Sequence, residues 1–511
     1  RFSLPNPFAT DRWLPGWAVV LLAAAALLAG VAAARLPLLW VAAGFGVLVL
    51  VVLTLVEPVV GLCAALILGP TKPLTDVYVP EFPLDAGQLL LILTLGAWFL
   101  HAARRHRIRV PHSPLNVPVL IFLGAAALSL VNALSLGYAL EELIKWGQIL
   151  LVMWLVVDMG QRGRWRAVLG AVLGAAAVQA AIGVWQFGLR GDGPEHFLIL
   201  GDRFYRAYGT FEQPNPYGGF LGLALAVAVG LALVGLEQWF GPVWGALRGQ
   251  RPVNARRVVA ALFNKNIWRL AALAVLAGLM LAGLLASWSR GAWLGFAAAA
   301  VAILFAWPRR AWLGVLLVAG GVGLGLLLLA SGLLPAAIAD RLTGFTAFVQ
   351  SFDVRGVDIT TANFAVIERL AHWWAAQEMA RYNFWLGVGI GNYEPVYPAY
   401  ALMNWPQPLG HAHNFYLNLL AETGIIGAVA YGLMWAAVIW QTWRATRSGT
   451  HWRRGVAIGL FGAWMHLSVH HLVDKLYVAN LHLHIGALFG ILTILSALER
   501  NPEAEASTID N

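Results

Sequence analysis

The sequence has few charged residues and almost no cysteine for a chain of 511 residues. Charged side chains make up 12% of it, hydrophobic ones make up 60%, and the mean hydropathy is +0.71. A soluble globular domain carries roughly twice that share of charge, so this class is excluded. Cys63 is the single cysteine and lies in an apolar run, which rules out an intramolecular disulfide and gives no support to thiol redox chemistry.

Patterns typical of several other classes are also missing. The apolar segments lack the short alternation of an outer-membrane barrel, and no long repeat or heptad pattern occurs. No His-Glu-x-x-His or Asp-rich ligand set is present, so we expect no metal site and no cofactor. The spacing of His466 with His470, or of His482 with His484, permits a metal ion and is a weaker alternative.

Long apolar runs dominate what is present. They predict an all-α fold, a polytopic transmembrane helical bundle of 12–14 spans with a large ordered loop on one face. Fourteen spans follow if every run crosses the membrane, and twelve if the early ones are re-entrant or merged. We expect the first run to be retained, because it is too long for a signal peptide. The spans are predicted near residues 14–34, 36–56, 57–70, 86–102, 114–134, 142–158, 167–188, 216–236, 268–287, 292–306, 312–330, 413–443, 455–473 and 481–498.

The net charge of +9 would suggest nucleic acid in a soluble protein, but here the basic residues follow the predicted topology. They gather in loops that fall on one side when the N-terminus is cytoplasmic, which is the positive-inside pattern. We therefore expect cytoplasmic termini, contact with membrane lipids and no nucleic acid partner. The basic segments are Arg104 to Arg109, Arg162 to Arg166, Arg248 to Arg269, Arg309 with Arg310, Arg444 to Arg454, and Arg500.

The predicted topology divides the chain into four parts. Transmembrane helices with short loops are expected over 1–330, a cap over 331–412, further transmembrane helices over 413–498, and a disordered cytoplasmic tail over 499–511. The cap shares its face with the loops 71–85 and 189–215 and with the turn at Ser289 to Gly291. Within the cap, residues 363–381 have helical spacing. Phe364, Ile367, Ala371 and Trp374 are predicted on one side of that helix, and Arg369, His372, Trp373 and Ala376 on the other.

Arginines on the face of the cap are candidates for holding an anionic ligand. Arg290 lies between two apolar spans, where an unpaired guanidinium is costly, so it must face water, a headgroup, or a partner such as Asp474 or Glu422. The other arginines, taken alone, fit solvated surface equally well. Together, four arginines with few acidic neighbours suit a phosphate or pyrophosphate held by bidentate hydrogen bonds. The four are Arg203, Arg206, Arg290 and Arg369.

His413 is the candidate for proton transfer, because it lies where the cap enters a span. Histidine is the side chain best matched to general-base chemistry near neutral pH. Asn414 and Glu422 supply polar neighbours on the same helix, while His411 belongs to the preceding loop. An interfacial histidine satisfied by a carbonyl is the alternative. Further histidines on this side, interpreted mainly as packing or interfacial residues, are His470, His471, His482 and His484.

The pattern His413-Asn414, nine residues, then Gly424-x-x-Gly427 resembles the signature of the bacterial O-antigen ligases. These enzymes belong to the O-antigen ligase and polymerase superfamily of inner-membrane glycosyltransferases. The resemblance spans roughly residues 200 to 430, together with the topology. Looser matches are Arg206-Ala-Tyr-Gly-Thr-Phe with Pro214-Asn215, the turn Ser289-Arg290-Gly291, and Arg369 with Trp373 leading into Leu386 to Tyr393.

The resemblance implies transfer of a glycan from undecaprenyl pyrophosphate to lipid A-core oligosaccharide at the periplasmic face, completing lipopolysaccharide. It assigns His413 as catalytic base and Arg290, Arg369 and Arg206 as pyrophosphate ligands, without a metal, with Asn414, Glu422 and His411 in support. The chain departs from the family in its first 60 or so residues, which look longer than a member needs. It also lacks the Arg-x10-Gly pattern of the related polymerases at Arg203, Arg206, Arg369 and Arg381, which favours a ligase.

Two other functions stay open at this point. One is an O-antigen polymerase or protein oligosaccharyltransferase of the same superfamily. The other is a membrane transporter, which would favour paired broken spans in two related halves and ionisable groups near the bilayer midplane. The charged candidates here gather at one face, so transport is the less favoured of the two.

Overall fold

The structure is a computed structural model, and it describes residues 37–78, 84–106, 109–160, 163–201, 203–248, 255–343, 354–360, 363–448 and 451–500, together with residues 30 and 35. The all-α class is confirmed, and β1 and β2 form a single two-stranded antiparallel pair within the described chain. The helices are α2 (Leu38–Val56), α3 (Pro58–Leu68), α4 (Lys72–Tyr78), α5 (Ala86–Arg104), α6 (Asn116–Leu128), α7 (Leu136–Met159), α8 (Trp165–Gly188), α9 (Pro214–Arg248), α10 (Ala255–Leu262), α11 (Asn266–Ala286), α12 (Arg290–Ala306), α13 (Ala311–Ala330), α14 (Ala336–Thr343), α16 (Phe364–Tyr382), α17 (Tyr393–Val396), α18 (Phe415–Ser448), α19 (His451–His470) and α20 (Leu481–Arg500). Shorter elements are η1 (Gly69–Thr71), η2 (Ser129–Asn132), η3 (Glu195–Phe197), η4 (Tyr397–Ala399), β1 (Leu198–Ile199) and β2 (Phe204–Tyr205).

The predicted spans from residue 36 onward coincide with helices. Nine helices among the described residues are long and apolar enough to cross a membrane, and α12 and the α6–η2 segment are shorter apolar helices. Three spans were predicted too short: α3 continues through η1 and α4 to Tyr78, α7 begins at Leu136, and α9 extends to Arg248. The predicted span 14–34 and the predicted tail lie almost wholly outside the described residues.

Close backbone approaches hold the centre of the bundle together. Helix α9 packs along α19, and α12 and α11 pack beside this pair. A Cβ on Gly230 would lie 2.4 Å from the carbonyl oxygen of Gly455, and one on Gly459 would lie 2.5 Å from the Cα of Val227. Glycine therefore lets the two backbones meet, and this close packing supplies the association energy that apolar surfaces cannot gain inside a lipid bilayer.

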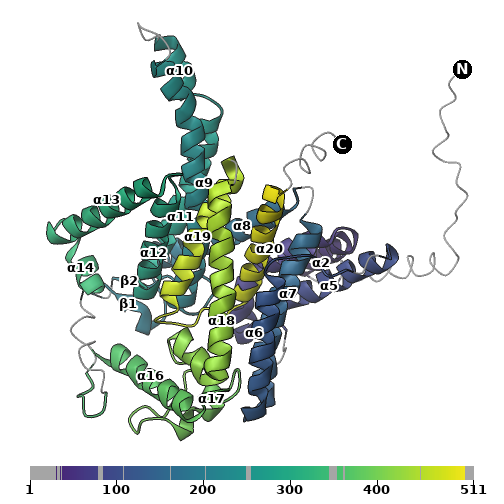
Figure 1. Cartoon of the computed structure of the whole chain (residues 1–511), viewed down its shortest axis with the longest axis vertical. Helices are drawn as coiled ribbons and strands as arrows, with labels where there is room; N and C mark the ends of the chain where they lie inside the picture. The colour runs from purple at the N-terminus through teal and green to yellow at the C-terminus, as the bar shows by residue number, and fades with distance from the viewer. Residues whose placement is uncertain are drawn as a thin grey trace, which may run out of the picture.

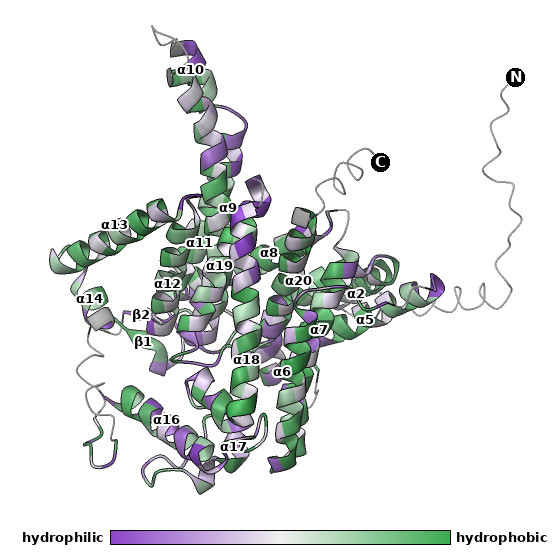
Figure 2. Ribbon diagram, in the orientation of Figure 1, coloured by the Kyte–Doolittle hydropathy of each residue, from purple (hydrophilic) through white to green (hydrophobic). Residues whose placement is uncertain are grey.

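The two ends of the bundle differ as the charge pattern predicts. Figure 1 shows α10, from a predicted basic loop, at one end and the cap elements α16 and α17 at the other. The helices between these ends are predominantly hydrophobic in Figure 2. The basic loop and the cap therefore lie on opposite faces, while the assignment of each face to a compartment stays a prediction.

Helix α16 confirms the helix predicted within the cap, but the prediction of its faces was wrong. Ile367 and Ala371 are buried as expected, yet His372 and Ala376 from the other side are buried too, and Phe364 is 46% exposed. The reason is that α16 contributes to two separate apolar clusters, one completed by the chain around Trp405 and the other by the chain from Val388 to Ala421. Cap residues 344–353 and 361–362 lie outside the described residues.

Helix α18 was predicted as one continuous span, and this too was wrong. Gly424 has φ 62° and ψ −168°, so the helix is broken there. Ile425 N–H donates to the carbonyl oxygen of Phe384 at 2.8 Å, and a Cβ on Gly424 would lie 2.3 Å from the carbonyl carbon of Trp385. Only glycine tolerates this positive φ and close contact. The glycine of the histidine motif thus docks the cap against α18.

Candidate active site

The turn between α11 and α12 positions three arginines at the cap end of the bundle. Trp288 has φ 53° and reverses the chain there, and the Ser289 hydroxyl accepts a hydrogen bond from Ala292 N–H to cap α12. The carbonyl of Ser287 accepts a hydrogen bond from Arg206 Nε at 3.0 Å. The carbonyl of Trp288 accepts one from Nη2 of Arg341, the second arginine, at 2.9 Å. Arg290, the third, begins α12.

A fourth arginine, Arg369, reaches the same region from α16. Burial, together with the positive charges of Arg341, Arg369 and Arg290, lowers the pKa of Arg206 to about 9. Burial and the charges of Arg290 and Arg369 likewise lower the pKa of Arg341 to about 10. Both values lie above neutral pH, so Arg206 and Arg341 are charged. We call Arg206, Arg290, Arg341 and Arg369 the arginine cluster.

No guanidinium of the arginine cluster forms a direct ion pair with a carboxylate of the described residues. Arg206 Nη2 donates to the side-chain oxygen of Asn215 at 3.3 Å, and the buried Nε of Arg341 has no hydrogen-bond partner. The first turn of α12 adds positive potential, because its amide groups point toward the helix start. Four guanidinium groups and a helix N-terminus without a counterion are suited to a ligand with several negative charges.

The sequence allowed two carboxylates as partners for Arg290, and both are engaged elsewhere. Asp474 faces histidines, as described below, and Glu422 Oε1 accepts a hydrogen bond from Tyr393 N–H at 3.2 Å. Glu422 also accepts Gly389 N–H through its own carbonyl, at 2.9 Å. It therefore fastens the cap turn to α18. Arg203, considered beside Arg206 in the sequence, is exposed.

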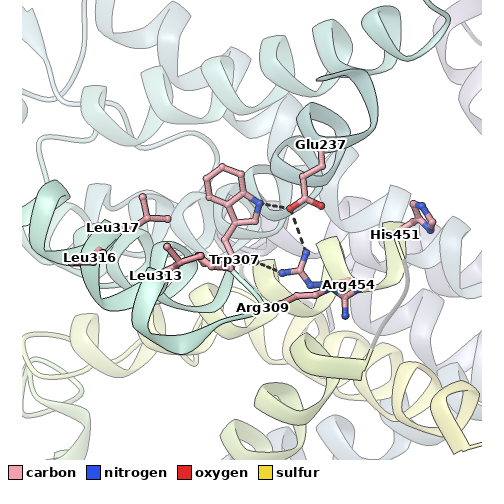
Figure 3. A pocket seen from close by; sticks show the side chains of 9 residues that line it. Glu237, Trp307, Arg309, Leu313, Leu316, Leu317, His451 and Arg454 are labelled. Carbon is pink, nitrogen blue, oxygen red and sulfur yellow. Dashed lines mark hydrogen bonds and ion pairs between the residues drawn. The ribbon is translucent and has the colours of Figure 1, made fainter. Parts of the chain in front are cut away.

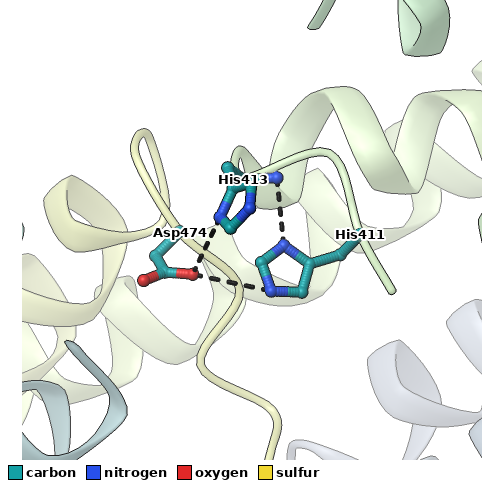
Figure 4. Close-up of side chains that lie close together, drawn as sticks. All are labelled: His411, His413 and Asp474. Atoms are coloured by element: carbon teal, nitrogen blue, oxygen red, sulfur yellow. Dashed lines mark hydrogen bonds and ion pairs between the residues drawn. The ribbon is translucent and has the colours of Figure 1, made fainter. Parts of the chain in front are cut away.

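His411, His413 and Asp474 form the second group of the site, shown in Figure 4. Asp474 Oδ1, from the α19–α20 loop, lies 3.7 Å from His411 Nε2 and 3.9 Å from His413 Nδ1. His413 has φ 50°, a conformation that non-glycine residues seldom adopt. Trp373 Nε1 of α16 donates to the His413 carbonyl at 3.4 Å. The cap helix thus holds the histidine in this position.

Asn414 and Asn418 fix the loop that carries these histidines. The side-chain oxygen of Asn414 accepts hydrogen bonds from the amides of Tyr416 at 3.0 Å and Leu417 at 3.1 Å, so Asn414 caps α18. The side-chain oxygen of Asn418 accepts the amide of Ala412 at 3.0 Å. The sequence predicted that Asn414 supports His413 as a polar neighbour. In the structure, its side chain caps α18.

The hydrogen bonds of His411 favour a proton relay over a metal site. Its Nδ1 accepts the backbone N–H of His413 at 3.0 Å, so in the neutral ring the proton lies on Nε2, directed at Asp474. A metal ligand would need that Nε2 lone pair. The three side chains are close enough together to hold an ion, but this protonation pattern fits one poorly.

Burial and neighbouring charges decide the protonation of the groups around His413. Burial lowers the pKa of His411 to about 3 and that of His372 to about 4, so both rings are neutral at neutral pH. Burial raises the pKa of Asp474, but the facing imidazoles of His413 and His411 more than offset it, so the carboxylate is ionised. Both ring nitrogens of His413 are buried without a hydrogen-bond partner in the described chain.

Several residues of the site were missed from the sequence. Burial raises the pKa of Glu368, and electrostatic interactions with His413 and Arg369 oppose that rise. Glu368 and Arg369 thus connect the histidine group with the arginine cluster. Arg341 was not considered, and Asp474 was considered only as a partner of Arg290. Arg341 ends a short amphipathic helix, and Asp474 lies 61 positions after His413, so neither had a local signal.

A comparison with known protein families gives a match over part of the chain. Residues 275–432 match the model of the family described as O-Antigen ligase, and no curated protein matches the chain significantly. The matched segment contains Arg290, Arg341, Arg369 and His413, whereas Arg206 and Asp474 fall outside it. Residues 275–432 are therefore similar to the O-antigen ligase family, which supports the superfamily that the histidine motif resembles.

Proposed function

We propose that the protein transfers a glycan from undecaprenyl pyrophosphate to the core oligosaccharide of lipid A, at a periplasmic face formed by the cap end of the bundle. One observation carries the proposal. No guanidinium of the arginine cluster forms a direct ion pair with a carboxylate of the described residues, and Glu368 and Arg369 connect the cluster to His413, whose two ring nitrogens have no hydrogen-bond partner there. A pyrophosphate supplies the missing negative charge, and the histidine supplies a base for an acceptor hydroxyl.

The reaction is a single displacement with inversion. The acceptor hydroxyl oxygen attacks the anomeric carbon of the donor, the bond from that carbon to the pyrophosphate oxygen breaks, and His413 takes the hydroxyl proton. The pyrophosphate leaves with the bonding electron pair, and its growing negative charge is held by the arginine cluster. Fixed cations directed at developing charge lower the barrier, because they need no reorganisation during the reaction.

Asp474 stabilises the product of the proton transfer. Once His413 is protonated, the ionised carboxylate 3.9 Å from its Nδ1 favours the imidazolium. The same carboxylate oxygen accepts the backbone N–H of Lys475 at 2.9 Å, which holds it in place. His411 is a positioning residue, because its Nδ1 holds the backbone of His413 in the strained conformation.

The product distinguishes this reaction from those of related enzymes. Purified protein is incubated with an undecaprenyl-pyrophosphate glycan, lipid A-core and a glycan-accepting protein, and each product is separated by gel and mass spectrometry. The ligase gives glycan on lipid A-core. Longer glycan on undecaprenyl pyrophosphate would instead identify a polymerase, and glycosylated protein an oligosaccharyltransferase. EDTA should leave the rate unchanged, and loss of activity restored by Mg²⁺ would contradict the metal-free mechanism.

A further inference from the structure

We propose that the cavity between α9, α12, α13 and α19 is a binding site for an anionic phospholipid. The cavity has a volume of about 780 Å³ and lies at the end of the bundle that carries α10, away from the cap. Figure 3 shows polar side chains of α9 and α19 facing leucines of α13 across it. Its lining residues are Glu237, Trp307, Pro308, Arg309, Leu313, Leu316, Leu317, His451 and Arg454.

One side of the cavity is a rigid polar wall. Glu237 Oε1 accepts hydrogen bonds from Trp307 Nε1 at 2.7 Å and from Arg454 Nη1 at 3.5 Å. Arg454 also donates to the carbonyl oxygens of Thr446 and Trp307, and its side chain is 5% exposed. Its hydrogen bonds are therefore used inside the protein, and Glu237 largely neutralises it.

Arg309 supplies the unbalanced charge. It is exposed at the turn between α12 and α13, and its side chain makes no hydrogen bond or ion pair with the described residues. Nearby, Arg447 Nη1 donates to the carbonyl of Pro308 at 2.7 Å, while its buried Nε has no partner in the described chain. Among the described residues, Glu237 is the only carboxylate that lines the cavity. This excess of positive charge between helices near a membrane surface is complementary to a phosphate headgroup.

The other side of the cavity is suited to acyl chains. Leu313, Leu316 and Leu317 have helical spacing and form one face of α13. Helix α13 is long and apolar enough to cross a membrane, yet almost none of it is covered by the rest of the described chain. Free phosphate would leave this apolar wall in contact with water, and a zwitterionic lipid would leave Arg309 unneutralised. An anionic phospholipid satisfies both sides.

This site is separate from the proposed reaction. Arg290 begins α12 and Trp307 directly follows its end, so the 17 residues of the helix place the two sites about 25 Å apart. Lipid binding at Arg309 therefore does not depend on the assignment of His413 or of the arginine cluster, and the two proposals fail independently.

Native mass spectrometry of the full chain tests the site with phosphatidylglycerol, phosphatidylcholine and inorganic phosphate as probes. We expect retention of phosphatidylglycerol in preference to phosphatidylcholine, and no retention of phosphate. Arg309→Gln should weaken phosphatidylglycerol binding about fivefold. Arg310→Gln is the matched control, because Arg310 is the adjacent exposed arginine and does not line the cavity. Equal effects of the two variants, or equal retention of both lipids, would overturn the proposal.

A second pair of variants tests the cavity by filling it. Leu317→Trp should reduce the number of phosphatidylglycerol molecules retained by one, whereas Val315→Trp, on an exposed part of α13 outside the cavity, should not. Thermal melting of each variant shows that it is folded. Unchanged lipid retention in folded Leu317→Trp protein would contradict binding at this site, and retention of phosphate alone would identify an anion site without a lipid.

Discussion

The two ends of α12 both gather arginines, but they differ in what faces the positive charge. At the cap end, Arg206, Arg290 and Arg341 have no carboxylate partner among the described residues, and backbone carbonyls hold two of them. At the other end, Glu237 pairs with Arg454 and leaves mainly Arg309 free. A buried cation that is paired supports the fold, whereas a group of cations without counterions needs a ligand. The proposed pyrophosphate site therefore differs from the proposed headgroup site in its charge balance more than in its number of arginines.

We expect the largest change in the rate of glycan transfer when the proposed base, His413, is removed. His413→Ala should reduce glycan transfer by about 10²–10⁴-fold and leave donor binding intact, because the base acts only on the acceptor proton. A gel shift for glycan-capped lipid A-core measures transfer, and donor binding is measured on the same folded protein. His411→Ala should cost less, since His411 positions His413 without taking the proton. A near-parental rate for His413→Ala would show that the assignment is wrong.

We expect the next largest change in transfer rate at Arg290, and comparison with Arg309 distinguishes the two ends of α12. Arg290→Ala should slow transfer about 10²-fold at saturating donor, because it removes a fixed charge from the leaving pyrophosphate. Arg290→Lys should restore the rate only in part, since an ammonium group cannot form the bidentate fork. Arg309→Ala, at the other end of α12, is the control and should leave transfer unchanged. Similar losses in both variants would remove the distinction between the ends.

Acid should weaken the cap, because His372 is buried within it as a neutral ring. The pKa of His372 is about 4 in the folded cap, chiefly because of burial, against an ordinary value near 6.5. Between these values the unfolded cap binds a proton that the folded cap does not, so stability falls as pH falls through this window. Hydrogen exchange of α16 from pH 7 to pH 4 measures this, and His372→Gln should reduce the change. Equal protection of α16 at both pH values in the parent would contradict it.

We expect the smallest effect, on stability alone, at the end of α12 where Glu237 pairs with Arg454. Glu237→Gln should lower the free energy of unfolding by about 1 kcal/mol, because the amide keeps the hydrogen bond to Trp307 but loses the ion pair with Arg454. Transfer should proceed at the parental rate. Chemical denaturation and the gel-shift assay measure the two quantities, and a loss of activity without a loss of stability would link this end to the reaction.

Much of the fold could be predicted from the sequence, because a helix that crosses the bilayer needs an apolar run that matches the bilayer thickness. The spans from residue 36 onward, the amphipathic helix in the cap and the separation of basic loops from the cap all follow from local composition. The break at Gly424 and the burial of both faces of α16 could not be predicted in the same way. Both depend on the cap folding back onto α18, which brings Trp385 against Gly424 through a contact between distant segments.

The residues of the candidate site likewise fall into those with a local sequence signal and those without one. His413, Arg290 and Arg369 could be selected because each has a charged or titratable side chain beside a span, and the resemblance to a known family added their roles. Asp474 and Arg341 could not, because their importance comes only from neighbours brought close by the fold. Asn414 was noticed as a neighbour of His413, but its position as the cap of α18 follows from backbone hydrogen bonds.

An experimental structure of the protein with undecaprenyl pyrophosphate tests the central claim most directly. We expect both phosphates within hydrogen-bonding distance of Arg206, Arg290, Arg341 and Arg369 at the cap end of α12, with the side that would bear the glycan turned toward His413. Density for the pyrophosphate at Arg309 and Arg454, or at the cap end with the arginine cluster unengaged, would contradict it.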